Sequence, residues 1–91
     1  MTRFVRSRTA LWRRVGGEIL LAAPGRPDVD RLSNSAGAVW TLLEEPIPAS
    51  ALVATLSDAY GVPRGQITGD VEALLADLQA RGWVEEVIGD G

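Results

Sequence analysis

The hydrophobic pattern of this chain changes its period near residue 33, and this change limits the fold more than any other feature. After this point, apolar residues recur at helical spacing. Before it, short β-favouring segments alternate with glycine and proline turns, as in antiparallel sheets. The segments are residues 9–15, 18–22 and 29–32, and the turns are Gly16-Gly17 and the cluster at 24–28. Strands first and helices after predict the α+β class.

We expect the three strand segments to form one antiparallel sheet, followed by three helices. The first helix is predicted at 34–45, with Ser33 as its N-cap. The second covers residues 48–60 and places Tyr60 on its buried face. The third helix is predicted to start at Pro63, with a weak helical tendency up to Thr68 and a strong one after it. It ends at Gly82, which is expected to adopt the left-handed conformation that terminates helices. A small N-terminal three-stranded sheet followed by three helices is the set of elements found in a winged helix-turn-helix. Residues 85–91 are expected to be an extended tail.

The chain is long enough for one domain, residues 1–91, with a firm core of about 8–87. Hydrophobic residues make up 46% and charged residues 23%, which is a globular composition. No apolar run approaches the ~20 residues of a membrane-spanning helix, and no signal peptide is recognisable. We therefore expect a cytoplasmic protein without a membrane partner.

Three residue types are missing from the chain: Cys, His and Lys. Their absence excludes disulfides, thiolate nucleophiles, Schiff bases, Ser-His-Asp relays and cysteine or histidine metal sites. No glycine-rich phosphate loop is present either. The chain is therefore predicted to be a binding protein rather than an enzyme, with no catalytic residues, no metal site and no cofactor.

Charge is distributed unevenly along the chain. Residues 1–31 hold seven arginines and three acidic residues, whereas residues 32–91 hold two arginines and nine acidic residues. Phosphate contacts need Lys or Arg, so the acidic part disfavours a nucleic-acid partner.

Residues 32–43 and 70–82 resemble two signature stretches of the PqqD-like family. In the first, Leu32-Ser33 is followed by Ala36, Trp40 and Leu43, similar to the family's Leu-Asn-x-x-Ala-x-x-x-Trp-x-x-Leu. In the second, the matching stretch is Asp70-Val71-x-x-Leu74-Leu75-x-x-Leu78-x-x-x-Gly82. Ser33, Leu74 and Trp83 depart from the family's Asn, Phe and Leu. The resemblance covers roughly residues 8–87, and its motifs are core and cap residues.

The resemblance implies a RiPP recognition element, a module that captures the leader of a ribosomally synthesised precursor peptide and presents it to a maturase. It implies that the leader adds as a strand beside the third strand and lies along the third helix. An exposed strand edge carries unpaired amides and carbonyls that suit this pairing. The maturase is left open as a radical enzyme, a cyclase or a protease.

The expected peptide-binding residues lie on the third strand and on the flank of the third helix beside its core stripe. Leu74 is expected to receive an apolar leader side chain, and Asp70, Asp77 and Arg31 to select charge. The full set is Asp28, Val29, Asp30, Arg31, Leu32, Asp70, Leu74, Asp77, Leu78 and Arg81.

Each of these side chains also has a purely structural interpretation. Leu74 can be a core residue, and Asp70 can favour the positive end of its helix. Asp77 and Arg81 can form an exposed pair one helical turn apart. Arg31 can guard the strand edge against aggregation. The three tryptophans are interpreted as core or cap-packing residues.

Two alternative functions remain open from the sequence. A winged-helix DNA-binding protein would place the third helix in the major groove, although that helix is acidic. A homodimer would pair the exposed strand edge with a second copy of the chain.

Overall fold

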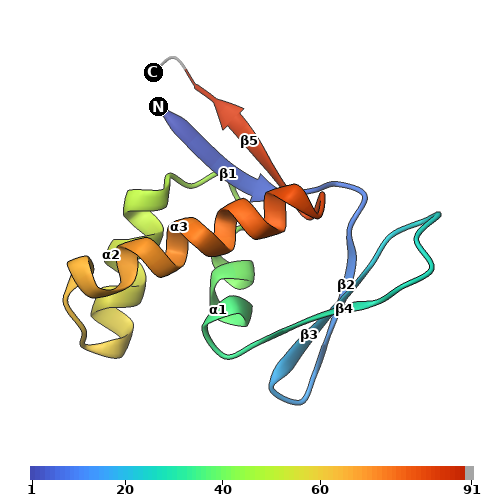
Figure 1. Ribbon diagram of the computed structural model, residues 1–91, viewed down its shortest axis with the longest axis horizontal. Helices are drawn as coiled ribbons and strands as arrows, with labels where there is room; N and C mark the ends of the chain where they lie inside the picture. The colour runs from blue at the N-terminus through green and yellow to red at the C-terminus, as the bar shows by residue number, and fades with distance from the viewer. Residues whose placement is uncertain (90–91) are drawn as a thin grey trace.

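The computed structural model describes residues 1–89, and these form two antiparallel sheets and three helices (Figure 1). One sheet has the strand order β2-β3-β4, and the other pairs β1 with β5. The α+β class is confirmed. The elements are β1 (Thr2–Arg6), β2 (Leu11–Val15), β3 (Glu18–Ala22), β4 (Asp30–Ser33), α1 (Ser35–Leu42), α2 (Ala49–Tyr60), α3 (Arg64–Ala80) and β5 (Val84–Ile88).

Side chains in the three-stranded sheet alternate between a buried face and an exposed one. On the central strand β3, Ile19 and Leu21 are buried while Leu20 lies on the opposite face. The same alternation on β4 buries Leu32 and exposes Arg31. This period of two is the one that the sequence pattern predicts for a half-buried sheet.

The second sheet was not predicted. The extended tail predicted at residues 85–91 is a strand over most of its described part: β5 pairs antiparallel with β1, from Thr2 opposite Ile88 to Arg6 opposite Val84. Residues 90–91 of the expected tail lie outside the described residues. β1 is held on its other side by Ile47, whose amide and carbonyl bond to Phe4 at 3.0 and 2.8 Å. The two ends of the chain therefore lie side by side (Figure 1).

The start of α1 differs from the prediction, whereas the start of α3 follows it. Ser33 does not cap α1: it is the last residue of β4, and the N-cap position belongs to Asn34, which makes no side-chain capping bond. Asn34 has a φ of 54°, a positive value that Asn adopts more often than most other non-glycine residues. α3 begins at Arg64, directly after Pro63 at the N-cap, as expected, and its first turns are helical although Gly65 and Gly69 predicted them to be weak.

Two helix ends are defined by local hydrogen bonds. α1 ends at Leu42, three residues earlier than predicted. The end of α3 follows the prediction, since Gly82 is left-handed with a φ of 83°. Its N–H donates to the carbonyl of Gln79 at 3.0 Å, and the Trp83 N–H donates to that of Leu78 at 2.9 Å. These two bonds form a Schellman motif, which turns the chain sharply from α3 toward β5.

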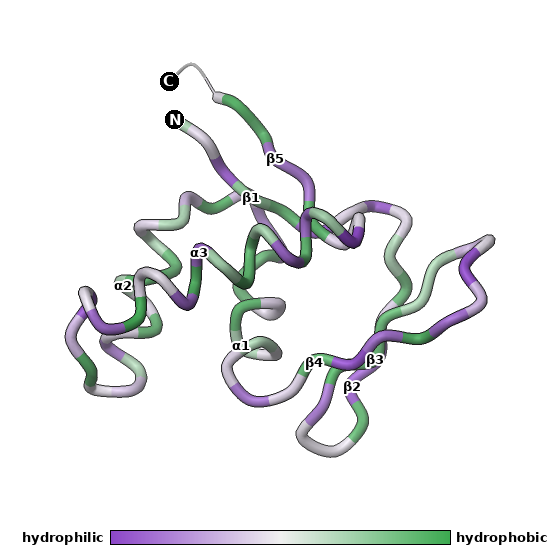
Figure 2. The backbone as a smooth tube through the Cα atoms, in the orientation of Figure 1, coloured by the Kyte–Doolittle hydropathy of each residue, from purple (hydrophilic) through white to green (hydrophobic). Residues whose placement is uncertain are grey.

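The core lies between the buried face of the sheet and the three helices. In Figure 2, hydrophobic and hydrophilic residues alternate along α3, as expected for a helix with one buried side. Tyr60 departs from the prediction, being 55% exposed, because the last turn of α2 lies outside the core. No helix among residues 1–89 is both long and apolar enough to span a membrane. The largest fully buried side chains are Trp40, Trp83, Ile19, Leu21, Leu43, Leu52, Leu78 and Val39.

Arg6 joins β1 to α1 and to the three-stranded sheet. Its Nε donates to the carbonyl of Trp40 at 2.9 Å, in the last turn of α1, where the Leu43 N–H also donates to this carbonyl at 3.2 Å. Its guanidinium lies 4.7 Å from the Trp12 ring centre and 5.1 Å from that of Trp40. Burial lowers the pKa of Arg6, and the carboxylate of Glu44 partly opposes this effect. The cation–π contact with Trp12 holds the exposed strand β2 against the core.

Trp83 joins the start of β4 to the end of α3. Its indole Nε1 donates to a carboxylate oxygen of Asp30 at 2.5 Å, and Arg81 lies 3.7 Å from the same oxygen. The Trp83 carbonyl accepts the Ser7 N–H at 2.8 Å, and the guanidinium of Arg26 covers the ring at 4.3 Å. Trp83 is 1% exposed, so its indole N–H needs an internal acceptor. This contact fixes the distance between β4 and α3.

Replacing Gly82 by Ala is expected to destabilise the fold by about 1–2 kcal/mol, because only glycine adopts the left-handed conformation without strain. The added Cβ also meets the Arg26 guanidinium, which can move aside. Gly69→Ala is the matched control: it lies within α3 with open space around it, and helix propensity predicts a gain of about 1 kcal/mol. Urea unfolding measures both, and a loss of stability in both variants would contradict this account.

Replacing Asp30 by Ala is expected to cost about 1–3 kcal/mol of unfolding free energy, because the buried Trp83 N–H then has no acceptor. Asp30→Asn keeps an acceptor oxygen and should lose less. Asp28→Ala removes an exposed carboxylate two residues away that makes no ion pair in residues 1–89, so it should change stability by less than about 0.5 kcal/mol. Thermal and urea unfolding compare the three; equal effects at positions 28 and 30 would show that the hydrogen bond contributes nothing.

Candidate functional site

β4 is an edge strand with one free side. It pairs antiparallel with β3, and the sheet order ends with β4. Within residues 1–89, its backbone makes no hydrogen bond to any segment other than β3. In a strand of four residues, two present their N–H and C=O groups to the neighbouring strand and two present them outward. The outward groups can pair with one further extended segment.

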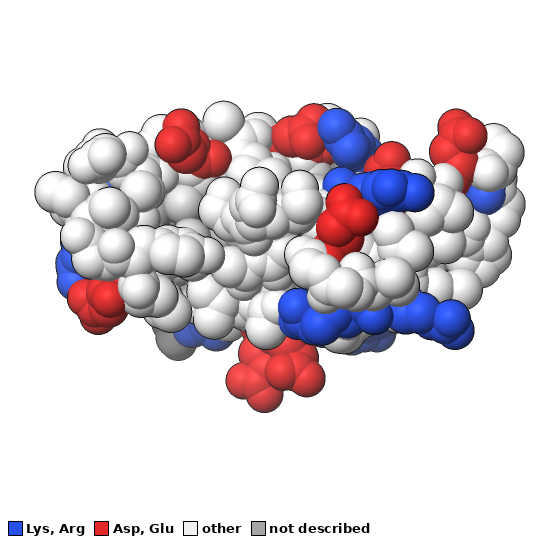
Figure 3. Space-filling model, turned by 90° about the horizontal axis from the view of Figure 1, so that it is seen from below, with Lys and Arg blue, Asp and Glu red and all other residues white. Residues whose placement is uncertain are grey.

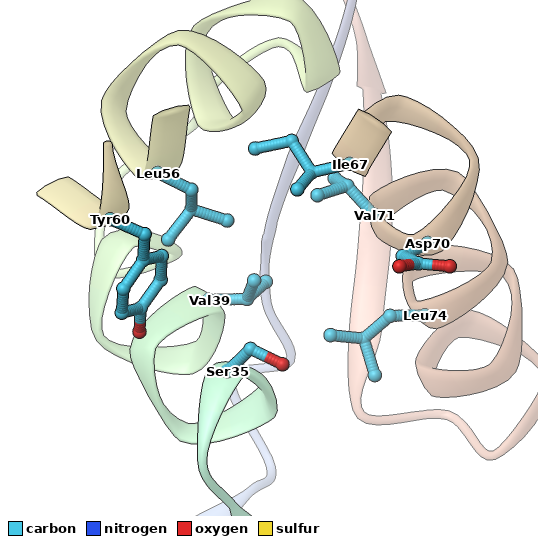
Figure 4. A pocket seen from close by; sticks show the side chains of 8 residues that line it. All are labelled: Ser35, Val39, Leu56, Tyr60, Ile67, Asp70, Val71 and Leu74. Carbon is cyan, nitrogen blue, oxygen red and sulfur yellow. The ribbon is translucent and has the colours of Figure 1, made fainter. Parts of the chain in front are cut away.

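An apolar hollow, with a volume of about 80 Å³, opens between the three helices near the end of β4. Leu74 and Ile67 of α3 and Leu56 and Tyr60 of α2 point into it from opposite sides (Figure 4). One water molecule needs roughly 15 Å³, so this space can hold the end of a larger apolar group. Its full lining is Ser35, Val39, Leu56, Tyr60, Ile67, Asp70, Val71 and Leu74.

A polar hollow lies at the other end of β4. Its charged groups neutralise one another in part, since Arg81 lies 3.7 Å from Asp30 and 3.3 Å from Asp77. Across residues 1–89, no three His, Cys, Asp or Glu side chains gather closely enough to hold a metal ion. The hollow is lined by Arg26, Pro27, Asp28, Asp30, Arg81 and Trp83.

The two hollows show that β4 and α3 run in opposite directions. Asp30, at the start of β4, lies beside Arg81 at the end of α3. Ser35, just after β4, lines the same hollow as Asp70 and Leu74 in the first half of α3. The free edge of β4 therefore extends between an apolar hollow and a polar one, with α3 along its length.

The structure brings seven of the ten predicted site residues to this edge. Leu74 is half-buried and Asp70 exposed, and both line the apolar hollow. At the polar hollow, Asp30 already binds Trp83 and Arg81, so its carboxylate positions β4 rather than standing free. The other four are Asp28 and Arg81, which line the polar hollow, Asp77, which pairs with Arg81, and Val29, exposed just before β4.

The side chains of three predicted site residues lie elsewhere. Leu78 is wrong as a contact residue: it is 0% exposed, because it belongs to the core stripe of α3. Leu32 is buried, so only its backbone belongs to the edge. Arg31 points to the face of the sheet opposite the core, where its guanidinium lies 3.9 Å from Glu18. Arg31 therefore cannot reach either hollow.

Sequence reasoning missed several residues of both hollows. Tyr60 is predicted on the buried face of its helix, yet it lines the apolar hollow together with Ile67. Arg26 was taken as part of a turn, and its position over Trp83 depends on a contact between residues far apart in sequence. One sequence signal could have indicated that Tyr60 is exposed: it directly precedes the helix-ending Gly61, and the last turn of a helix is often only partly covered by the rest of the protein.

Comparison with solved structures shows that the fold of this chain is similar to that of a known protein. The protein TbiB1, solved in complex with the TbiA(beta) leader peptide, superposes with a TM-score of 0.81 at 21% sequence identity. The match covers 94% of this chain and 99% of the TbiB1 chain. At this identity the match establishes the fold. A search of curated protein sequences gave no match.

Comparison with family models gives an assignment that covers most of the chain. The model described as coenzyme PQQ synthesis protein D, PqqD, matches residues 18–84. This range begins at β3 and ends at the first residue of β5, so it includes the β4 edge, both hollows and all three helices. The family resemblance inferred from the motifs is confirmed: this chain belongs to the PqqD family.

Proposed function

We propose that this chain binds the leader segment of a ribosomally synthesised precursor peptide as an added strand at β4. It then presents the peptide to a modifying enzyme, without a catalytic step of its own, from a winged helix-turn-helix scaffold. The observation that carries this proposal is the free edge of β4 between two hollows along α3. Membership of the PqqD family and the fold of leader-bound TbiB1 support it.

The geometry of β4 limits the length of peptide that it can bind. From Asp30 to Ser33 the strand advances about 10 Å at roughly 3.3 Å per residue, so about four leader residues pair with the edge. Backbone hydrogen bonds to β4 would supply affinity that does not depend on the leader's sequence. Alternate leader side chains would face α3, because neighbouring residues of a strand point to opposite sides.

The apolar hollow is proposed to select one of those side chains. Leu74 is half-buried and faces Leu56 and Tyr60 across the hollow (Figure 4). A branched aliphatic or aromatic leader side chain would remove these groups from water, at about 25 cal/mol per Å² of apolar surface. The leader is thus expected to carry an apolar residue near the end of β4.

Charge selection is proposed to depend on Asp70. Its carboxylate lines the apolar hollow and forms no ion pair within residues 1–89, whereas Asp77 is already paired with Arg81. A basic leader residue beside the apolar one would therefore be favoured by a charge that is otherwise unpaired. Asp30 is assigned a positioning role, since its carboxylate holds Trp83.

The alternatives from the sequence are outcomes of the same binding experiments. Asp70, Glu72 and Asp77 make the exposed side of α3 acidic, which opposes docking in a DNA groove. Tight, steeply salt-dependent binding of mixed-sequence DNA would nevertheless overturn the leader proposal. So would a dimer, paired through β4, that saturating leader peptide leaves unchanged.

Replacing Leu74 by Asp should weaken leader binding at least tenfold, which corresponds to about 1.4 kcal/mol, because it puts a charge into the apolar hollow. Ala76→Asp is the matched control, since it adds the same carboxylate on an exposed position almost opposite on the α3 wheel. The probe is the synthetic leader of the precursor peptide encoded beside this chain, measured by calorimetry. Equal weakening in both variants would mean that the hollow does not contact the leader.

Strand addition itself is tested by methylating backbone amides of the same leader at alternate positions. One of the two alternating sets should abolish binding and the other should have little effect, because only every second amide of an added strand faces β4. Amide NMR shifts should cluster at residues 28–32 and 70–81. Equal tolerance of both methylated peptides, or shifts confined to residues 3–14, would contradict strand addition at this edge.

A further inference from the structure

The face of the three-stranded sheet that points away from the core is an exposed apolar surface. Of its side chains, only Val29 is also among the residues placed at the proposed leader edge. Leu11 and Val15 on β2 are 61% and 49% exposed, and Val29 just before β4 is 57% exposed. Leu11, Leu20 and Val29 line a shared hollow on this face. We name this surface the outer face and define it by Leu11, Arg13, Val15, Leu20, Val29 and Arg31.

Positive charge lies at the centre of the outer face. The strand register places Arg13 and Arg31 on either side of Leu20. Arg31 lies 3.9 Å from Glu18, whereas Arg13 forms no ion pair within residues 1–89. In the view from below, most of the basic side chains visible lie in the half that carries the sheet (Figure 3). A complementary surface would be apolar with carboxylates placed to meet these arginines.

A second copy of this chain does not fit the outer face. In a two-fold symmetric pair, Arg13 and Arg31 of one copy would meet the same arginines of the other. Three strands about 4.8 Å apart and five residues long offer roughly 250 Å². A stable complex buries about 800 Å² per partner, so this face alone cannot hold a permanent dimer. It suits a partner that binds transiently or that uses neighbouring surface as well.

The neighbouring surface is the bound leader itself. A leader strand added to β4 becomes the fourth strand of the same sheet, next to Arg31. Its alternate side chains face α3, and the others extend the outer face. A protein docked on the outer face would therefore contact the leader directly, without displacing it from β4. Binding of the two ligands would then be mutually favourable, since coupling between two binding sites is reciprocal.

We propose that the outer face docks the enzyme that modifies the leader-bound peptide, through an apolar surface of that enzyme bordered by carboxylates. This inference rests on the proposed function and identifies where its second partner binds. The leader and the enzyme occupy opposite sides of one strand: the leader pairs with the edge of β4, and the enzyme covers the exposed face beside it.

The double variant Leu11→Asp and Val15→Asp tests this proposal. Both positions are exposed and lie on β2, which β3 separates from the leader edge, so leader affinity should stay within twofold. The probe is the purified peptide-modifying enzyme encoded beside this chain. Its affinity for the wild-type chain should rise when leader is present and should fall at least tenfold in the double variant. Arg13→Glu should weaken it too and reduce its dependence on salt.

Ile88→Asp is the matched control, because Ile88 is an equally apolar residue, 80% exposed, on the other sheet. It should leave enzyme binding unchanged, and circular dichroism checks that all variants fold. The proposal is overturned if the double variant binds the enzyme normally, if the wild-type chain does not bind it, or if Ile88→Asp weakens it equally. If the double variant loses enzyme binding but neither the wild-type chain nor any variant binds leader, the outer face is still the docking site for the enzyme. The proposed leader capture would then be refuted.

Discussion

The hydrogen bond from the Trp83 indole to Asp30 is the contact on which the candidate site depends. It joins the first residue of β4 to the chain just after α3, 53 residues away. Because the backbone of Trp83 is also part of the α3 terminator and accepts the Ser7 N–H, three segments meet at one buried residue. A strand edge binds a peptide between itself and a helix only if their spacing is fixed beforehand, since ordering them on binding would reduce affinity.

The N-terminal strand β1 and its contacts also help to fix the spacing between β4 and α3. β1 bonds to β5, to Ile47 and to the end of α1, and Arg6 places its guanidinium between Trp12 and Trp40. The small β1–β5 sheet therefore holds the helices together rather than extending the three-stranded sheet. Among residues 1–89, this arrangement leaves one edge of β4 without a strand partner, because the terminal strands pair with each other.

The parts of the fold that sequence analysis predicted are those that depend on neighbouring residues. The period of two in β3 and β4 and the left-handed Gly82 are local signals, and they predicted the strands and the end of α3 correctly. The β1–β5 sheet could not be predicted in this way, because its paired residues are up to 86 positions apart in sequence. For the site, periodicity identified Leu74 and Asp70 on the flank of α3.

The errors at the site have the same physical origin. Leu78 belongs to the α3 stripe with Val71 and Leu75, so helical periodicity already pointed to the core rather than to a peptide. Arg31 alternates with buried Leu32, so strand periodicity pointed it away from α3. Asp30 is different, because no local pattern indicates that its carboxylate is used by an indole beyond α3. Arg26 likewise reaches Trp83 only through tertiary packing.

Selectivity at such an edge has to come from few side chains. The backbone of β4 would accept any extended segment, so the selection of the peptide would depend on the apolar hollow and on Asp70, which has no ion pair within residues 1–89. Two such contacts separate peptides modestly, since one apolar group contributes about 1–3 kcal/mol. A second protein that covers the outer face would contact the other alternate side chains of the same strand. This chain and the docked enzyme would then contact alternate side chains on opposite sides of the peptide. Either protein alone would contact only one of these two sets.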